Sequence, residues 1–403
     1  MSTPAAGRWQ LWPLYAAGFT TAFGAHSVAA TLGAEGSDLF GPEGSDLFGP
    51  AGSELHTSLL YLGLLLALYD GAEVVLKPVF GTLADRVGAR PVMIGGLVAF
   101  AVCSALFVIA DDAGWLWLTR LGQGAAASAF SPAASALVAR LNPSVSHGRA
   151  FGSYGFYKSL GYTLGPLLGG VIVWIGGLPA LFVVLTALAA AVAVWAAAAV
   201  PSVPPLPKSR QTVVDLARRL ADRTFLGPTA ALAAATAALS VGVGFLPVSG
   251  AAAGLGPVAT GAAVSVLALT AAVVQPRIGR AFDAGRFSAT AGMTVGLVIT
   301  AVGLALATVP GPAGVLLAAV GIGVGTGVIT PLGFAALASS TPPERMGQTM
   351  GAAELGRELG DAGGPLLVAG VAAAATLTAG YAALAVVVAL LPATPQLRRT
   401  RVP

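Results

Sequence analysis

The sequence predicts an all-α membrane protein in which twelve transmembrane helices form two pseudo-symmetric six-helix bundles, with both termini in the cytoplasm. Three observations predict this fold class: an apolar composition, recurring apolar runs and an internal repeat. Of the 403 residues, 56% are hydrophobic and 9% are charged, and the mean hydropathy is +0.83. Soluble domains contain about 25% charged residues. The composition therefore excludes an ordinary water-soluble domain.

Apolar runs long enough to cross about 30 Å of hydrocarbon recur along the whole chain. The first run is too long for the core of a signal peptide, so we interpret it as a retained helix. The twelve expected spans lie at about 10–33, 57–80, 91–110, 115–138, 150–173, 178–200, 228–249, 257–278, 288–308, 313–337, 349–371 and 376–392.

The distribution of positive charge predicts the topology. Seventeen of the 21 Lys and Arg residues fall in loops and tails on the side of the amino terminus, and the external loops contain none. Because Lys and Arg concentrate in cytoplasmic loops of membrane proteins, both termini are expected in the cytoplasm. The net charge of +4 therefore reports topology, and no nucleic-acid partner is expected.

The chain repeats itself at a spacing of about 198 or 199 residues. GSYGFYKSLGYTLGPLL at 152–168 aligns with GAAELGRELGDAGGPLL at 351–367, and KPVFGTLAD at 77–85 aligns with QPRIGRAFD at 275–283. Parallel repeats of this kind are typical of transporters built from two similar halves. We expect an amino-terminal half at 1–200, a cytoplasmic linker with a surface helix at 201–227 and a carboxy-terminal half at 228–403.

The external loop expected at 34–56 contains a tandem duplication. EGSDLFGP occurs at 35–42 and again at 43–50. Gly, Ser, Pro and acidic residues dominate, so no packed structure is expected. We interpret the segment as a duplicated insertion; the alternative is a vestibule that collects cations.

Eight ionisable residues lie within the expected spans. Each would cost about 2.5–3.5 kcal/mol at a lipid-facing helix centre, so they are expected to face protein or a water-filled cavity. On the second run, the two acids share one face with Lys77; on the eleventh run, all four charges share one face. All of the eight residues except Lys158 are candidates for proton coupling or gating. The alternative is that they form a static salt-bridge network. The eight are Asp70, Glu73, Arg120, Lys158, Glu354, Arg357, Glu358 and Asp361.

The segment GTLADRVGARP at 81–91 resembles the signature loop of the major facilitator superfamily, G-x-L-x-D-R-x-G-R-R/K. Ala89 is the one departure, at a position where a basic residue is common. The matching residues are Gly81, Leu83, Asp85, Arg86, Gly88 and Arg90. The resemblance implies a conformational loop between two helices. We expect the Asp85 carboxylate near the amino end of the eleventh helix, around 346–350, where the helix dipole favours negative charge.

Two further segments resemble motifs of this superfamily, and specifically of its twelve-helix drug/proton antiporter branch. LTRLGQG at 118–124 is similar to the fourth-helix motif L-x-R-x-x-Q-G, which implies a role for Arg120 in proton transfer or coupling; a structural arginine is the alternative. GYTLGPLLGG is similar to the exporters' fifth-helix motif G-P-x-x-G-G, which implies antiport. Its residues are Gly161, Gly165, Pro166, Gly169 and Gly170.

The same resemblance implies that helices two and eleven meet, so that Asp70 and Glu73 could reach Arg357. Five polar residues are candidates for the substrate cavity. Among them, the lysine could bind an anionic substrate or pair with an acid. The histidine could carry protons or simply be hydrogen-bonded inside the bundle. The five are His26, Gln123, Ser128, Ser131 and Lys158.

Several chemistries are not indicated. The sequence has no zinc-ligand spacing, no phosphate-binding G-x-x-x-x-G-K-S/T loop and no nucleophile elbow in a water-accessible setting. We therefore expect no enzyme, no metal and no cofactor, and an ion gradient as the energy source.

These observations favour a secondary active transporter that exports a small hydrophobic or amphiphilic compound in exchange for protons, by alternating access. The alternatives are proton-coupled uptake of a small anionic metabolite and a non-transporting receptor on a transporter fold. The expected partners are substrate, protons and the lipid bilayer of the cell membrane (the inner one in a cell with two). We expect the protein to function as a monomer.

Overall fold

The computed structural model describes residues 8–39, 54–109, 113–203 and 222–393, and these residues form helices without any strand. Single 3-10 turns lie at η2 (Ser144–Ser146), η3 (Pro343–Arg345) and η4 (Leu391–Ala393). The α-helices are α1 (Arg8–Leu39), α2 (Glu54–Val87), α3 (Ala89–Val108), α4 (Ala113–Leu141), α5 (His147–Ala199), α7 (Arg223–Ala252), α8 (Pro257–Asp283), α9 (Ala289–Leu306), α10 (Pro312–Ser339), α11 (Met346–Ala374) and α12 (Leu377–Leu390).

Six of the described helices are long and apolar enough to cross a membrane: α3, α5, α7, α8, α9 and α10. Helix α12 is apolar but has 14 residues. Helix α11 carries Glu354, Arg357, Glu358 and Asp361 within two turns. The criterion of apolar length therefore misses a helix that carries several charges, and the expected count of twelve spans stays a prediction.

Helix α5 contains two of the expected spans. It runs for 53 residues, and its backbone leaves helical geometry at Gly176 and Gly177. Gly177 has a φ of 70°, a conformation that glycine adopts without steric cost. The runs expected at 150–173 and 178–200 thus lie on the two arms of one kinked helix, with a two-residue break in place of a loop.

The signature segment is helical over most of its length, which corrects the expectation of a loop. Gly81, Asp85 and Arg86 lie in the last turns of α2, and Arg90 lies in the first turn of α3. Gly88 alone separates the two helices, with a φ of 105°. Because residues with a Cβ rarely adopt this conformation, one glycine is enough to reverse the chain.

Helix α1 also extends further than expected, to Leu39, which lies inside the first EGSDLFGP copy. Residues 40–53 lie outside the described residues. The two interpretations of the duplicated segment, an insertion or a vestibule that collects cations, therefore stay predictions. The same holds for 204–221, where the surface helix of the linker is expected.

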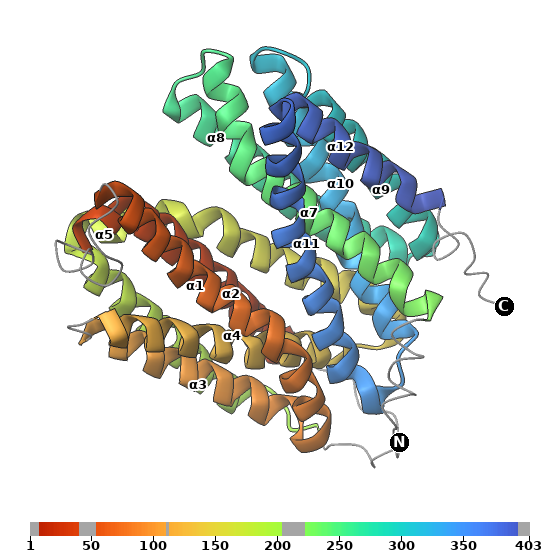
Figure 1. Cartoon of the computed structure of the whole chain (residues 1–403). Coiled ribbons are helices and arrows are strands. Elements are labelled where there is room, and N and C mark those ends of the chain that lie inside the picture. The colour runs from red at the N-terminus through yellow and green to blue at the C-terminus, as the bar shows by residue number, and fades with distance from the viewer. Residues whose placement is uncertain (1–7, 40–53, 110–112, 204–221, 394–403) are drawn as a thin grey trace.

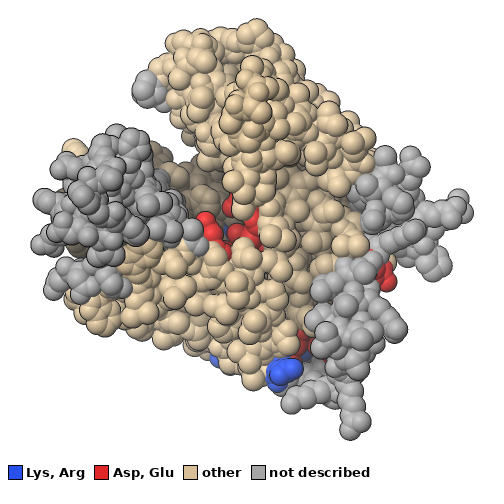
Figure 2. All heavy atoms as spheres, viewed as in Figure 1, with Lys and Arg blue, Asp and Glu red and all other residues tan. Residues whose placement is uncertain are grey.

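The helices form two lobes, with α1–α5 in the first and α7–α12 in the second (Figure 1). Within the first lobe, α1 packs against α5, and α3 packs against α4 and α5; within the second, α10 packs against α8 and α9. The lobes meet where α2 packs on α11 and α5 packs on α8. Towards the kink of α5 and the start of α8 the lobes diverge, and Figure 2 shows a cleft between them.

The two contacts between lobes are built alike from glycine. A methyl group on Gly81 of α2 would collide with the carbonyl oxygen of Gly347 on α11. A methyl group on Gly148 of α5 would collide with the carbonyl oxygen of Gly279 on α8. These positions correspond to each other in the 198- or 199-residue repeat, so the internal repeat of the sequence appears in space as two equivalent close helix contacts.

Candidate functional site

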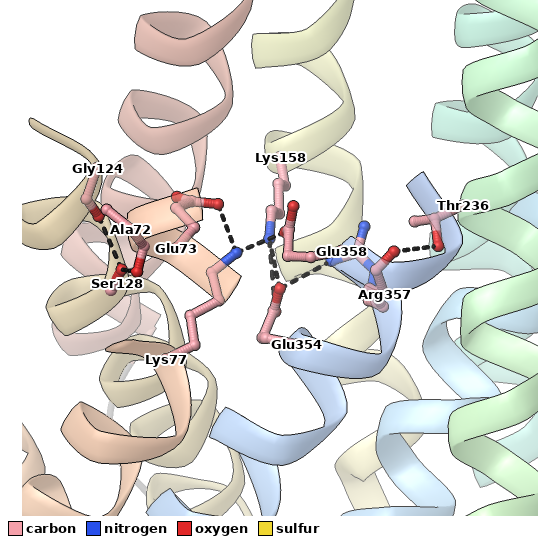
Figure 3. A network of polar contacts seen from close by, with 10 residues as sticks. All are labelled: Ala72, Glu73, Lys77, Gly124, Ser128, Lys158, Thr236, Glu354, Arg357 and Glu358. Carbon is pink, nitrogen blue, oxygen red and sulfur yellow. Dashed lines mark hydrogen bonds and ion pairs between the residues drawn. The ribbon is translucent and has the colours of Figure 1, made fainter. Parts of the chain in front are cut away.

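A chain of ion pairs crosses the interface between the lobes (Figure 3). Lys77 Nζ lies 2.6 Å from Glu73 Oε2, one turn earlier on α2, and 2.5 Å from Glu358 Oε1 on α11. Lys77 and Glu73 are both buried, with 1% and 5% of their surfaces exposed. One buried ammonium group thus binds a carboxylate from each lobe.

A second set of charges lies beside the first on α11. Glu354 Oε2 accepts from Lys158 Nζ of α5 at 3.3 Å and from Arg357 Nη1 at 3.2 Å. Glu354 is fully buried. On the far side, Thr236 Oγ1 of α7 donates to the carbonyl oxygen of Arg357 at 2.9 Å. Here one carboxylate binds a cation from each lobe.

The two sets carry opposite net charges. The acidic triad, Glu73–Lys77–Glu358, has two carboxylates and one ammonium and so a formal charge of −1. The basic triad, Lys158–Glu354–Arg357, has two cations and one carboxylate and so a formal charge of +1. Removing one partner of a buried ion pair typically costs about 3–5 kcal/mol. The six charges of the two triads sum to zero, so the excess charge of each triad is compensated by the other triad.

One oxygen of the acidic triad lacks a donor. Glu73 Oε1 is buried and accepts no hydrogen bond from the described part of the chain. Buried polar atoms nearly always have a hydrogen-bond partner. An unpaired one can therefore indicate a position at which a proton or a ligand binds reversibly. A carboxylate oxygen in this position can accept a proton or an N–H group.

A small cavity of about 30 Å³ adjoins the basic triad. Both cations of the triad line it, together with aromatic rings from the two lobes. Phe151 of α5 and Phe334 of α10 are stacked, with ring centroids 5.4 Å apart. Gln275 of α8 also lines the cavity; its Nε2 donates to Ser159 Oγ at 2.8 Å. The Oε1 atom of Gln275 is buried and has no partner among the described residues.

Carboxylates lie at the bottom of the cleft. Asp70 of α2 and Asp361 of α11 are exposed, and the side chain of Glu358 is 19% exposed. Figure 2 shows acidic atoms deep in the cleft between the lobes. The acidic triad is therefore reached from the cleft.

The fourth-helix motif is buried next to this site but outside both triads. Arg120 is 2% exposed, and its Cζ lies 4.4 Å from the centroid of the Tyr69 ring. Its Nη1 donates to Gln123 Oε1 at 3.2 Å, and Gln123 Nε2 donates to Ser104 Oγ at 2.9 Å. The motif thus connects α4 with α2 and α3.

The other cavity candidates on α4 are also buried. Ser128 Oγ lies 2.7 Å from the carbonyl oxygen of Gly124 and 3.3 Å from that of Ala72 on α2. Ser131 Oγ has no partner among the described residues. Neither serine lines the cavity, in contrast to Lys158.

His26 of α1 lies against Tyr162 of α5, which lines the cavity. The ring centroids are 4.3 Å apart, and His26 Nδ1 is 3.1 Å from the carbonyl oxygen of Ala22. The glycines of the fifth-helix motif also face α1: methyl groups on Gly161, Gly165 and Gly169 would collide with or crowd it, whereas Gly170 has open space around it. The motif therefore allows close packing inside the first lobe.

The expected contact of Asp85 with the amino end of α11 is present. Its two carboxylate oxygens accept from the backbone N–H groups of Gly347 and Gln348, both at 2.7 Å. Asp283 at the end of α8 makes the matching contact, accepting from Gly148 and Arg149 of α5, both at 2.8 Å. The second contact was not expected, although the alignment of 77–85 with 275–283 contains the signal.

The ion pairs differ from the expected pairing of Asp70 and Glu73 with Arg357. Glu73 binds Lys77, and Arg357 binds Glu354. Lys77 was not among the candidates, although its i,i+4 spacing from Glu73 is typical of helical ion pairs. Within the described ranges, no group of three or more His, Cys, Asp or Glu side chains could hold a metal ion.

The family model described as Major Facilitator Superfamily matches residues 7–365. This chain belongs to the major facilitator superfamily. Proteins of this superfamily are multi-pass membrane transporters of small molecules and not enzymes. The motif resemblances in the sequence are thereby confirmed at the level of the family.

Two curated relatives match part of this superfamily member. Quinolone resistance protein NorA of Staphylococcus aureus (strain Mu50 / ATCC 700699) is 32% identical over 109 residues, which are 27% of this chain and 28% of NorA. Tetracycline resistance protein, class H, of Pasteurella multocida is 30% identical over 110 residues, which are 27% of each chain. The matched segments thus span about a quarter of the length of these relatives.

Solved structures show the same fold over nearly the whole chain. The human organic anion transporter MFSD10 (TETRAN) has a TM-score of 0.78 at 19% identity, covering 97% of this chain and 99% of its own. The Escherichia coli fucose:proton symporter FucP has a TM-score of 0.72 at 13% identity, covering 94% and 96%. At these identities the likeness concerns the fold alone.

Proposed function

We propose that this superfamily member is a proton-coupled antiporter that exports a small hydrophobic or amphiphilic compound by alternating access. The observation that carries the proposal is the pair of buried ionic links between lobes, Lys77–Glu358 and Lys158–Glu354. Movement of one lobe against the other must break or rearrange both links. Any ligand that changes their charge therefore changes the free energy of that movement.

The acidic triad is the proposed proton site. Protonation of Glu73 or Glu358 removes the excess negative charge, and the free Glu73 Oε1 offers a position for the proton. Asp70 and Asp361 would guide protons from the cleft, and Arg120 would favour the ionised form of nearby acids. In this proposal Glu354 and Arg357 serve gating, because they tie α11 to α5.

Export is supported by the names of NorA and the class H protein, which are resistance proteins, and by the fifth-helix motif. We also propose twelve spans in two six-helix halves, at 1–200 and 228–403, with a cytoplasmic linker between them and both termini in the cytoplasm. The protein would act as a monomer in the cell membrane. Asp85 and Asp283 would then hold the cytoplasmic side closed.

One observation favours a second function, proton-coupled uptake of a small anionic metabolite. Lys158 and Arg357 line the cavity, whereas the carboxylate between them, Glu354, is not among the lining residues. An anion bound there would add negative charge to the site and so favour simultaneous proton binding. Simultaneous binding gives symport.

Flux in proteoliposomes separates these functions. We would load vesicles with the fluorescent amphiphilic cation ethidium, impose pH gradients of either sign and follow both ethidium and a proton-sensitive dye. Antiport predicts that ethidium and protons move in opposite directions. Movement in the same direction would indicate symport. If the protein caused no flux of protons or of any probe, transport would be contradicted. Glu344→Gln, which removes an exposed carboxylate of η3, is the matched control for acid substitutions in the site.

A further inference from the structure

The basic triad presents only cations to the small cavity beside it. Lys158 and Arg357 line the cavity, and both are buried. Glu354, which binds both cations, is fully buried and is not among the lining residues. The triad therefore directs its formal charge of +1 towards the cavity.

We propose that this cavity is the binding site of one small monovalent inorganic anion of the size of chloride. The cavity has a volume of about 30 Å³, and a water molecule needs about 10–15 Å³. A halide ion is only slightly larger than a water molecule, so one halide fits and an organic anion does not. The anion is a resident ligand of the site and not the cargo.

Lys158 is the first donor for the anion. A lysine ammonium group has three N–H donors, and within the described ranges those of Lys158 bind the two oxygens of Glu354, at 3.3 and 3.4 Å. These distances are longer than the roughly 2.7–2.9 Å of strong charged hydrogen bonds. An N–H group of Lys158 can therefore turn to an anion in the cavity while Glu354 keeps Arg357.

The hydroxyl group of Tyr154 is the second donor. Tyr154 lines the cavity and is 2% exposed. Its Oη atom and the Oγ atom of the neighbouring Ser135 are both buried, and neither has a hydrogen-bond partner within the described ranges. A tyrosine hydroxyl can donate one hydrogen bond and accept another. Tyr154 can thus donate to the anion while it accepts from Ser135.

The anion would bind between the lobes. Tyr154 and Lys158 belong to α5 of the first lobe, and Arg357 belongs to α11 of the second. An anion in the cavity attracts the cations of both lobes at once. It should therefore stabilise the conformation in which Lys158 is linked to α11.

Anion binding should be linked to protonation of the acidic triad. The anion compensates the +1 charge of the basic triad and leaves the −1 charge of the acidic triad without its counter-charge, so it favours a proton there. By reciprocity, a proton at the acidic triad favours the anion. This consequence rests on the proposed function, in which the acidic triad is the proton site. The other charged and titratable groups around the two triads, among the described residues, are His26, Tyr69, Asp70, Arg120, Tyr154, Tyr162 and Asp361.

A chloride titration of the purified full-length chain tests the site. Chloride replaces gluconate stepwise at constant ionic strength, and the line width of the chloride NMR signal reports its exchange with the protein. We expect saturable binding of chloride, competition by bromide and no competition by sulfate, which is too large for the cavity. The absence of saturable binding, or equal competition by sulfate and bromide, would overturn the inference.

Two variants assign the donors. Lys158→Gln should weaken chloride binding at least about tenfold, as expected for the loss of a charged hydrogen bond. Tyr154→Phe, which keeps every charge, should weaken it about two- to tenfold. Arg280→Gln removes an exposed cation of α8 and is the matched control, with unchanged affinity. Unchanged affinity in both Lys158→Gln and Tyr154→Phe would place the bound chloride elsewhere and overturn the inference; if Lys158→Gln failed to fold, Tyr154→Phe would still decide.

The same titration at an acidic and an alkaline pH separates this inference from the proposed function. We expect tighter chloride binding at the acidic pH, and no such difference when Glu73→Gln and Glu358→Gln are combined. Chloride binding that did not vary with pH would keep the anion site and contradict the acidic triad as the proton site. Proton-coupled ethidium export without saturable chloride binding would keep the proposed function and overturn the inference.

Discussion

At the scale of single residues, Lys77 is the centre of the site. It binds Glu73 of its own lobe and Glu358 of the other, and no second lysine within the described ranges forms an ion pair with either acid. The excess carboxylate of the acidic triad is the reason why we propose this triad as the proton site.

This arrangement predicts the effect of removing the acids of α2. Replacing Asp70 with Asn and Glu73 with Gln should abolish accumulation of substrate against its gradient, because no carboxylate of α2 then remains beside Lys77 to exchange a proton. Substrate exchange at equilibrium should persist, since Lys158 and Arg357 are intact. Both are measured with the same vesicles, and Glu344→Gln should retain both. If the double variant still accumulates substrate against its gradient, protons couple elsewhere.

The sequence predicts most of the charges at the interface between the lobes, but not how they pair. Glu73, Glu354, Arg357 and Glu358 are identifiable because a charge cannot face lipid at acceptable cost. Their partners depend on the rotation of α2 and α11 and on rotamers, which a single sequence does not contain. Lys77 shares the face of Glu73 in the sequence, yet its contact with α11 becomes evident only in the packed structure.

At the scale of elements, two carboxylates cap the helices of the opposite lobe. Asp85 caps α11 and Asp283 caps α5. The amino end of a helix carries unpaired N–H groups and a partial positive charge, so each cap fastens one lobe to the other. Both caps lie next to a close glycine contact.

Loss of a cap should change the distribution of conformations. We expect Asp85→Asn to shift the population towards inward-facing states and to slow turnover more than it weakens substrate affinity. Asp283→Asn should have the same effect, and the double variant a larger one. Spin-label distances across the cytoplasmic face measure the shift. An unaltered distance distribution in all three variants would show that the caps are not latches.

The order of the helices was predictable because apolar runs are long and frequent. The residues at which the helices begin and end were less predictable. Asp85 and Arg86 are helical because TLADRV contains no Gly or Pro, and the helix ends before Gly88. The kink of α5 likewise depends on two glycines whose conformation is set by packing.

At the scale of the whole molecule, the internal repeat becomes two matching contacts between lobes. Asp85 and Asp283 are 198 residues apart and make equivalent caps. The charges break this symmetry: Lys77 aligns with Gln275, whereas Lys158 aligns with Arg357. The symmetric parts are suited to movement between two equivalent states, and the asymmetric ones to its coupling.

We propose that protonation of the acidic triad frees the lobes to move. Among the described residues, the charged and titratable groups near Glu73 and Glu358, besides Lys77, are His26, Tyr69, Asp70, Arg120, Lys158, Tyr162, Glu354, Arg357 and Asp361. Protonation weakens the Lys77–Glu358 link, so acidification should favour closing of the cleft.

The most direct test is the distance across the mouth of the cleft as a function of pH. Spin labels at Ile175 of α5 and Ala252 of α7, both exposed, would be placed in a background in which the single cysteine, Cys103, is replaced by alanine. We expect acidification to shorten this distance in the otherwise unchanged chain, and Glu73→Gln and Glu358→Gln together to hold it at the acid value at every pH. If the distance responded to pH equally in the double variant, protonation of the acidic triad would not control the movement of the lobes.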